Sequence, residues 1–318
     1  MADKTYSEDE QNALRASVRG IMETEGISQK GASDVSGVAY GTLNLWLNAK
    51  YEGDNDRVAA QIETWLASRK ENRRTATLVP AVPGFIETRT AADFTEALRF
   101  AQVLPEISVI VGVPGVGKTM TAQHYAKKNP NVWLATMNPA TAGVNNMLVE
   151  LADAMRLVER SAARLPGAIR HHVVGTAGLI IVDEAQHLTG PALDMLRSVY
   201  DRCGVGIALV GNETVLARLQ GCGRGNANFA QIYSRVGVRV SRAGPRVADV
   251  DALLAAWGVS GADERKFLHQ LAKKPGALRG VTKCLQLASM LAAGAGEPRA
   301  MKHLAAAWSR LTTDTEAA

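Results

Sequence analysis

The first seventy residues place apolar side chains at helical spacing. Residues 8–25 and 56–70 each carry an apolar stripe, which predicts two amphipathic helices. Between them, Ser28 is a good N-cap and Gly37 a good turn residue, so two short helices joined by a turn are expected. The pattern predicts an all-α helix-turn-helix domain over residues 1–68.

The second short helix, predicted over residues 40–48, would be the recognition helix that enters the major groove of DNA. It contains no Arg or Lys, and residues 1–70 carry 8 Lys and Arg against 11 Asp and Glu. An acidic domain is a poor match to a phosphate backbone. DNA contact and protein interaction both remain open for this domain.

Residues 69–84 interrupt the periodic pattern. The segment RKENRRTATLVPAVPG combines charges, threonines and two prolines, which is typical of a linker. A domain boundary is predicted here.

Beyond this segment, short apolar runs rich in Val and Ile alternate with helical patterns. Strands are predicted at residues 107–111, 131–137, 178–184, 205–210 and 236–241, and helices at 91–103, 120–128 and 142–157. Such alternation is typical of a parallel sheet with helices on both faces. Residues 85–244 are therefore predicted to form an α/β domain, with functional residues gathered where the parallel strands end.

The last part of the chain is wholly helical in pattern. Helices are predicted at residues 247–257, 262–273, 276–293 and 299–311. The final residues, TTDTEAA, are small and polar and are expected to be disordered. Residues 245–318 are predicted to form a C-terminal all-α domain.

Composition narrows the class of protein. The chain has 318 residues, 47% hydrophobic and 21% charged, which is ordinary for a globular protein. No apolar run approaches the roughly 20 residues that span a bilayer, and the polar N-terminus is unlike a secretory signal. Three widely spaced cysteines favour a reducing compartment and no zinc site. A cytoplasmic protein without a membrane partner is expected.

The net charge of +5 is unevenly distributed. Residues 1–70 have a net charge of −3, and the rest of the chain has +8. Attraction to nucleic acid, if any, is therefore expected mainly outside the N-terminal domain.

The first predicted strand runs directly into a glycine-rich loop. Residues 112–119 have the sequence GVPGVGKT, the G-x-x-x-x-G-K-[ST] pattern of a nucleotide-binding P-loop. Glycines let backbone amides approach phosphate oxygens. Lys118 adds a charge for the β- and γ-phosphates, and the Thr119 hydroxyl is placed to hold Mg²⁺. The predicted ATP site consists of Gly112, Val113, Pro114, Gly115, Val116, Gly117, Lys118, Thr119 and Met120.

The third predicted strand ends in two acids. In the segment LIIVDE, Asp183 is predicted to act on Mg²⁺, together with Thr119. Glu184 is placed to orient and deprotonate the attacking water. Together with an upstream P-loop, this pair predicts ATP hydrolysis.

Three more polar residues are candidates for sensing the nucleotide. Asn212 follows the fourth strand and is suited to hydrogen-bond the water or the γ-phosphate. Arg235 is a candidate arginine finger that acts on the nucleotide of a neighbouring subunit. Arg279 begins a C-terminal helix and is placed to reach back to the γ-phosphate. The alternatives are an ordinary turn residue for Asn212 and exposed arginines for the other two.

These residues, in this order, resemble an AAA+ ATPase. More specifically, the chain resembles the family of phage Mu transposition protein B from about residue 10 to about residue 311. The segments that carry the resemblance are KYEGDNDRV, FIET, VGVPGVGKT, NVW, IIVDEA and KPGALR.

The resemblance implies an ATPase that binds double-stranded DNA with little sequence preference and assembles on it into helical filaments when loaded with ATP. It implies delivery of that DNA to a DDE transposase, whose contact stimulates hydrolysis and gives target immunity. If the chain is phage-encoded, its place is the host cytoplasm. The segment between residues 157 and 174 is less basic than this family leads one to expect, which weakens any DNA-contact role for it.

For the DNA surface, the residues after Asn212 supply two cations, Arg218 and Arg224, in a segment expected to be a glycine-containing loop. A surface loop without a DNA role is the alternative. Two rival functions also remain: a helicase loader with the same ATP switch, and a non-hydrolysing scaffold or regulator in which nucleotide is structural.

Overall fold

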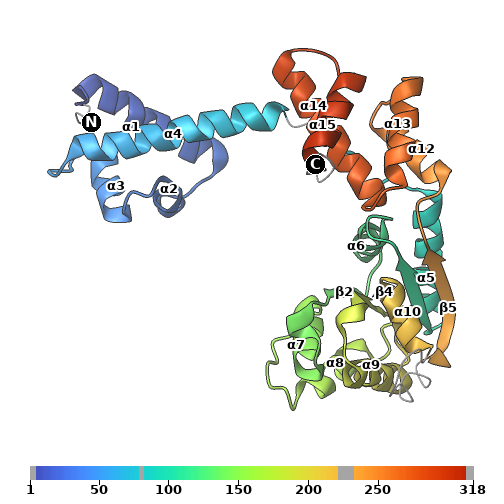
Figure 1. Cartoon of the computed structure of the whole chain (residues 1–318). Helices are drawn as coiled ribbons and strands as arrows, with labels where there is room; N and C mark the ends of the chain where they lie inside the picture. The colour runs from blue at the N-terminus through green and yellow to red at the C-terminus, as the bar shows by residue number, and fades with distance from the viewer. Residues whose placement is uncertain (1–4, 79–81, 221–232, 313–318) are drawn as a thin grey trace, which may run out of the picture. The chain divides into compact units, whose positions relative to one another are not determined.

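The computed structural model describes residues 5–78, 82–220 and 233–312. The chain divides into two compact units, residues 1–80 and 81–318, and each is described by itself (Figure 1).

The first unit consists of four helices around a small apolar core. They are α1 (Glu8–Glu25), α2 (Gln29–Ser36), α3 (Tyr40–Leu47) and α4 (Asn55–Leu78). The predicted caps are present: the Ser28 side chain accepts a hydrogen bond from the Gly31 amide, and Gly37 ends α2 in the left-handed conformation with φ 74°. Leu43, Trp46 and Ile62 are fully buried between the helices.

The first part of the predicted linker is helical. Residues 69–78 continue α4 to Leu78, because they consist largely of residues that tolerate a helix and contain no proline. The first proline, Pro80, follows two residues later, and a helix usually ends before a proline. The sequence of residues 69–78 has no apolar stripe, which is why periodicity missed this part of the helix.

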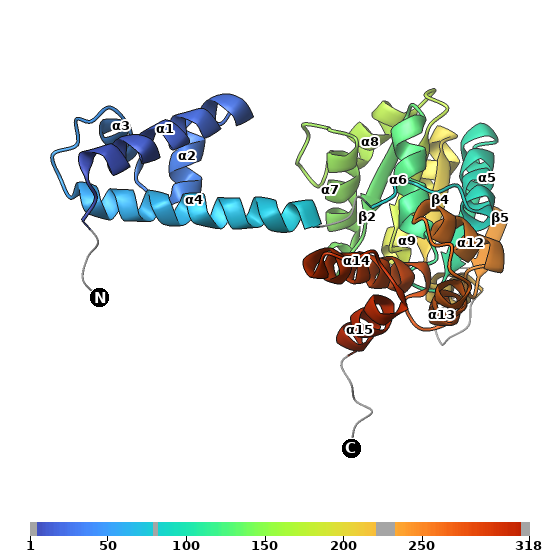
Figure 2. The same ribbon diagram turned by 90° about the horizontal axis from the view of Figure 1, so that it is seen from above.

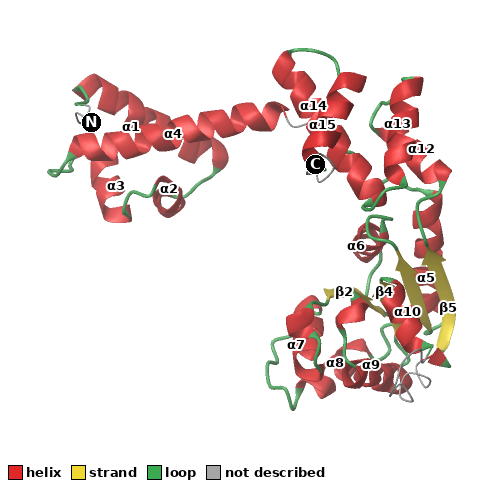
Figure 3. Cartoon of the chain, in the orientation of Figure 1, coloured by secondary structure: helices red, strands yellow, loops and turns green. Residues whose placement is uncertain are grey.

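The second unit is built on a five-stranded parallel sheet. Figure 3 shows its strands in yellow. In chain order they are β1 (Ile107–Gly112), β2 (Val132–Thr136), β3 (Leu179–Asp183), β4 (Gly206–Gly211) and β5 (Val236–Arg242). Their order across the sheet is β2-β3-β4-β1-β5, and every paired neighbour is parallel. All five predicted strands are confirmed to within about a residue at each end.

Helices cover both faces of this sheet. The helices are α5 (Arg89–Val103), α6 (Lys118–Lys128), α7 (Val144–Ala154), α8 (Leu165–Val173), α9 (Gly190–Cys203) and α10 (Glu213–Leu219), with short 3₁₀ turns η1 (Pro139–Thr141) and η2 (Ala185–His187). Along β3, Leu179 and Ile181 pack with α5 and α6, whereas Ile180 and Val182 pack with α7, α8 and α9. Both faces are buried, which explains the continuous apolar runs.

The last four helices form a group with its own core. They are α12 (Val247–Ala256), α13 (Ala262–Ala272), α14 (Ala277–Ala295) and α15 (Met301–Leu311). Leu254, Leu268, Val281, Leu285 and Leu304 are fully buried among them. Figures 1 and 2 show these helices, in orange and red, gathered together in the second unit. We call this group the lid.

Local structure differs from expectation in two places. The predicted helix 142–157 is shorter: η1 precedes it, and α7 covers only Val144–Ala154. The segment after Asn212, expected to be a loop, begins with α10, so Arg218 belongs to a helix. The predicted disordered tail falls almost wholly outside the described residues. Among the residues that the structure describes, no helix is long and apolar enough to cross a membrane.

Candidate nucleotide-binding site

The predicted site residues meet at one edge of the sheet. β4 lies between β1 and β3, with Val111 beside Gly211 and Val182 beside Leu209. The P-loop after β1, the acids after β3 and Asn212 after β4 therefore emerge from three adjacent strand ends. This is the edge at which parallel α/β sheets bind ligands.

The P-loop has the backbone that its glycines predict. Gly115 and Gly117 adopt φ values of 85° and 103°, which L side chains rarely adopt. Gly117 is the N-cap of α6, and no side chain caps that helix. Its first amides are oriented for an anion, and the helix dipole adds to the attraction.

Lys118 is held within this loop. Its Nζ donates hydrogen bonds to the carbonyl oxygens of Gly112 and Val113 at 2.7 and 3.1 Å. Burial lowers the pKa of the Lys118 amine, the nearby Glu184 and Asp183 carboxylates oppose that shift, and Arg279 adds to it. Lys118 thus lies in the field of both acids and of the lid arginine.

Thr119 and Asp183 lie side by side, as the predicted Mg²⁺ site requires. The Thr119 hydroxyl donates to Asp183 Oδ2 at 2.8 Å, and Asp183 is only 1% exposed. Burial raises the pKa of Asp183, against the opposing hydrogen bonds from Thr119 and the Glu184 amide. Within the described part of the chain, no cluster of three or more His, Cys, Asp or Glu side chains forms a metal site. A hydroxyl and one carboxylate fit the sparse protein shell of Mg²⁺ bound together with phosphates.

Glu184 occupies an unusual backbone conformation at the end of β3. Its φ and ψ are 53° and 37°, in the left-handed region, which is uncommon for a residue other than glycine and recurs at functional sites. Its amide donates to Asp183 Oδ1 at 3.0 Å. The Gln186 side chain donates from Nε2 to Glu184 Oε2.

Gln186 was not identified from the sequence. It lies in η2, and its Oε1 also accepts a hydrogen bond from the Asn212 amide at 3.3 Å. The sequence feature that could have identified it is its position two residues after Glu184, in the turn that follows β3.

Asn212 serves locally as the N-cap of α10. Its side-chain oxygen accepts a hydrogen bond from the Thr214 amide at 3.0 Å, which stabilises the start of the helix. The structure places it at the predicted edge of the sheet. Its contact with the γ-phosphate stays a prediction.

The two candidate arginines lie in different places. A Cβ on Gly115 would lie 2.0 Å from the Gly276 carbonyl oxygen and 3.2 Å from Arg279 Cβ, so the first turn of α14 lies against the P-loop. Arg235 instead precedes β5, whose first residue pairs with Ile107 at the start of β1. Its Nε donates to Asp201 at 2.7 Å. Arg235 is therefore at the edge opposite to the P-loop of its own chain.

Of the two candidate DNA residues, the structure describes only Arg218. Arg218 is half-buried, and its Nη1 donates to the Gln186 carbonyl at 2.9 Å. Arg224 lies outside the described residues. A DNA contact by either stays a prediction.

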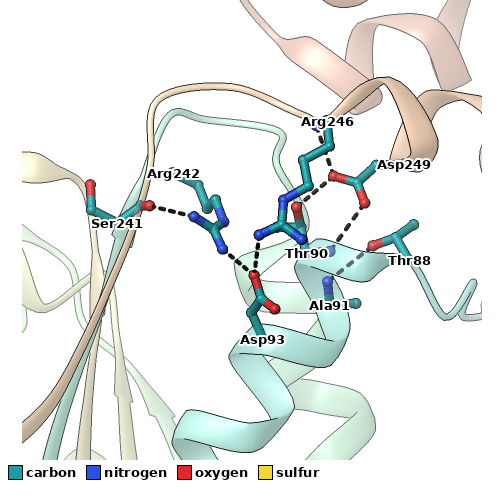
Figure 4. Close-up of polar contacts among 8 residues, drawn as sticks. All are labelled: Thr88, Thr90, Ala91, Asp93, Ser241, Arg242, Arg246 and Asp249. Atoms are coloured by element: carbon teal, nitrogen blue, oxygen red, sulfur yellow. Dashed lines mark hydrogen bonds and ion pairs between the residues drawn. The ribbon is translucent and has the colours of Figure 1, made fainter.

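A polar seam joins the lid to the core beside this site (Figure 4). Asp249 of α12 is completely buried and accepts hydrogen bonds from the Thr90 amide at 3.0 Å and the Arg246 amide at 2.9 Å. The Thr90 hydroxyl donates to its second oxygen.

The other half of this seam is an ion cluster. Arg242 and Arg246 both contact the Asp93 carboxylate, and the Arg242 carbonyl accepts a hydrogen bond from the Val113 amide at 3.1 Å. The P-loop, the edge strand β5 and the first lid helix are thereby mechanically connected.

A P-loop between β1 and α6, acids at the end of β3 with β4 between β3 and β1, and a helical lid against the loop define an AAA+ ATPase fold. Residues 104–219 match the family model described as an AAA domain. A solved structure of Drosophila ORC bound to DNA shares this fold with a TM-score of 0.54 at 16% identity, covering 74% of this chain and 64% of that one.

The more specific relationship spans nearly the whole chain. Residues 234–311 match the family model Mu B transposition protein, C terminal. The chain is 36% identical to ATP-dependent target DNA activator B of Escherichia phage Mu over 305 residues, 95% of this chain and 96% of that protein. It is 34% identical to the Mu-like prophage FluMu DNA transposition protein B of Haemophilus influenzae, over 81% of this chain and 90% of that one. The chain belongs to the Mu B transposition protein family.

Proposed function

We propose that this chain is an ATP-dependent activator of target DNA for transposition. The observation that carries the proposal is a complete P-loop site, with Thr119 on Asp183 and Glu184 beside them, in a chain related over 95% of its length to a phage target DNA activator. The predicted substrates are ATP and double-stranded DNA, and the predicted partner is a DDE transposase.

The nucleotide chemistry follows from the site. The amides of the P-loop and α6 bind the phosphates, and Lys118 exchanges its loop carbonyls for phosphate oxygens. Thr119 and Asp183 would hold Mg²⁺, which supplies positive charge to the phosphates when bound. Glu184 accepts a proton from the attacking water while the water oxygen forms a bond to the γ-phosphorus. The bond between the γ-phosphorus and the bridging oxygen breaks, and that oxygen leaves with ADP. The products are ADP and inorganic phosphate.

ATP acts in this proposal as an assembly switch. Arg279, in the lid, senses the γ-phosphate bound to its own chain, which explains why it lies against the P-loop. Arg235 lies too far from its own P-loop to contact that nucleotide and acts on the nucleotide of a neighbouring subunit. Subunits joined head to tail in this way form an open helical filament, which covers DNA without reading its sequence. Transposase-stimulated hydrolysis then removes the filament and provides target immunity.

Electron microscopy of the full chain with duplex DNA, in ATP and then in ADP, tests this proposal. Filaments in ATP that are absent in ADP are expected, together with DNA affinity that falls steeply with salt. Filaments that form equally in both nucleotides, or in neither, would contradict the ATP switch. Stimulation of turnover by a purified transposase, but not by a replicative helicase, identifies the partner class.

A further inference from the structure

Gln186 makes hydrogen bonds to three residues at the edge of the sheet where the P-loop lies. Its Nε2 donates to the Glu184 carboxylate, and its Oε1 accepts from the Asn212 amide at the end of β4. Its backbone carbonyl accepts from Arg218 of α10 at 2.9 Å. One residue thus joins the predicted general base to both the strand and the helix on which Asn212 lies.

The Gln186 side chain is half-buried and lies against the end of β4. A Cβ on Gly211 would lie 2.4 Å from Gln186 Oε1, so the carboxamide lies over the end of β4, where only glycine leaves room. The Glu184 backbone is held at φ 53°. A carboxylate on such a backbone points in a direction set by this turn and by its one side-chain donor.

We propose that Gln186 is a positioning residue, which orients the Glu184 carboxylate toward water and links that orientation to Asn212 and α10. This inference rests on the proposed role of Glu184 as general base. A carboxamide suits the task because it donates and accepts at the same time. A displacement of Asn212 or α10 on binding of the γ-phosphate is transmitted to Glu184 through two hydrogen bonds.

Two substitutions separate these two bonds. Gln186→Met keeps the length of the side chain but removes both hydrogen bonds. Gln186→Glu keeps an acceptor for the Asn212 amide and loses the donor to Glu184. The hydrogen bond from Gln186 to Glu184 is lost in both variants. If this bond positions Glu184, both variants lower kcat for ATP by about tenfold, measured on the full chain with saturating duplex DNA.

The ratio of kinetic constants distinguishes positioning from folding. KM and the dissociation constant of a fluorescent ATP analogue are expected to change by less than about twofold, because the hydrogen bonds of Gln186 go to Glu184, Asn212 and Arg218, which lie outside the P-loop. The melting temperature should stay near that of the wild type. The matched control is Gln123→Met, the same chemical change at an exposed position of α6, which should leave all these constants unchanged.

A double-mutant cycle completes the test. In single-turnover assays with radiolabelled ATP, adding Gln186→Met to Glu184→Gln should lower the remaining slow rate by less than about twofold, because Gln186 acts through Glu184. A further tenfold loss, or wild-type kcat in either single variant, would overturn the inference. Absence of ATP turnover in the wild-type chain would instead refute the proposed ATPase itself.

Discussion

At the scale of single residues, the site combines charges that oppose one another. Lys118 lies close enough to Asp183 and Glu184 for the two carboxylates to oppose the lowering of its pKa by burial. Asp183 is buried with one hydroxyl and one amide as donors, too few to compensate fully for its loss of water. A bound cation relieves this cost, which is why binding of nucleotide and metal should stabilise the fold.

The first prediction concerns Glu184. Glu184→Gln keeps the size of the side chain but cannot take a proton, so ATP turnover is expected to fall by about 10²- to 10⁴-fold. ATP binding should remain, and filaments on DNA should persist long after ATP is added. A phosphate-release assay and time-resolved electron microscopy measure the two effects. Rapid disassembly of filaments of this variant would show that release from DNA does not depend on ATP hydrolysis.

The second prediction concerns pH. Burial raises the pKa of Asp183 above its ordinary value of 3.8, so the folded chain holds this proton more tightly than the unfolded chain. Stability without nucleotide therefore falls as pH rises from the unfolded pKa through the folded one. Asp183→Asn should raise the melting temperature of the nucleotide-free chain at pH 7, and the gain should shrink toward pH 4. The same variant should gain less stability from Mg²⁺ and ATP than the wild type; an unchanged or lower melting temperature at pH 7 would contradict this account.

At the scale of elements, the first turn of α14 and the seam at α12 fix the lid on the core. Gly276 and Ala277 both have positive φ, at 98° and 45°, and this tight turn presents its carbonyl to Gly115 and its helix start to the P-loop. The seam joins α12 and the end of β5 to α5. It consists of the hydrogen bonds between Thr90 and Asp249 and of the ion pairs that Arg242 and Arg246 form with Asp93 (Figure 4). We therefore expect the position of the lid to depend on whether the P-loop holds a nucleotide.

The third prediction tests this seam. Asp249→Ala leaves the buried Thr90 amide and the partly buried Arg246 amide without their acceptor, and loss of the partner of a buried polar group costs about 1–3 kcal/mol. A loss of about 3 kcal/mol of stability in the second unit is expected, measured by urea unfolding. The control Asp263→Ala removes an exposed acid from the first turn of α13 and should cost less than about 1 kcal/mol. Equal losses in the two variants would show that the seam is not a special contact.

At the scale of the whole molecule, the position of Arg235 favours a site shared between subunits. β5 begins at the edge of the sheet opposite to the P-loop, and Arg235 is paired there with Asp201 at 2.7 Å and is one-third exposed. From that position Arg235 is expected to reach a nucleotide only on a neighbouring subunit, which requires the proposed head-to-tail assembly. The same assembly would produce a filament.

The fourth prediction is complementation in trans. Arg235→Ala and Glu184→Gln subunits should each be nearly inactive, and an equal mixture should regain about a quarter of wild-type turnover, because random neighbours pair an intact Glu184 with an intact Arg235 in that fraction of interfaces. Asp201→Asn is the control, since it breaks the pair within the chain and keeps the arginine. No recovery in the mixture would place the action of Arg235, if any, within its own chain.

Much of this molecule follows from local sequence. The P-loop, the acids after β3 and the strands were predictable because glycine positions, buried apolar runs and caps act over a few residues. Helix α10 was missed because its 7 residues are too few to show a clear periodic pattern, and the extension of α4 was missed because its sequence has no apolar stripe. The domain limits at residues 68 and 244 stay predictions, although residues 81–318 form one compact unit.

The sequence by itself determined where a phosphate is expected to bind, in the loop after β1, because the glycine amides, Lys118 and Thr119 are adjacent in the chain. Only the tertiary structure decided which distant residues meet that phosphate loop. The strand order places Asn212 between the P-loop and the acids, the lid brings Arg279 against Gly115, and the same sheet carries Arg235 to the far edge. Gln186 shows the same division, since its hydrogen bonds to Asn212 and Arg218 depend on the packing of separate elements rather than on any local pattern.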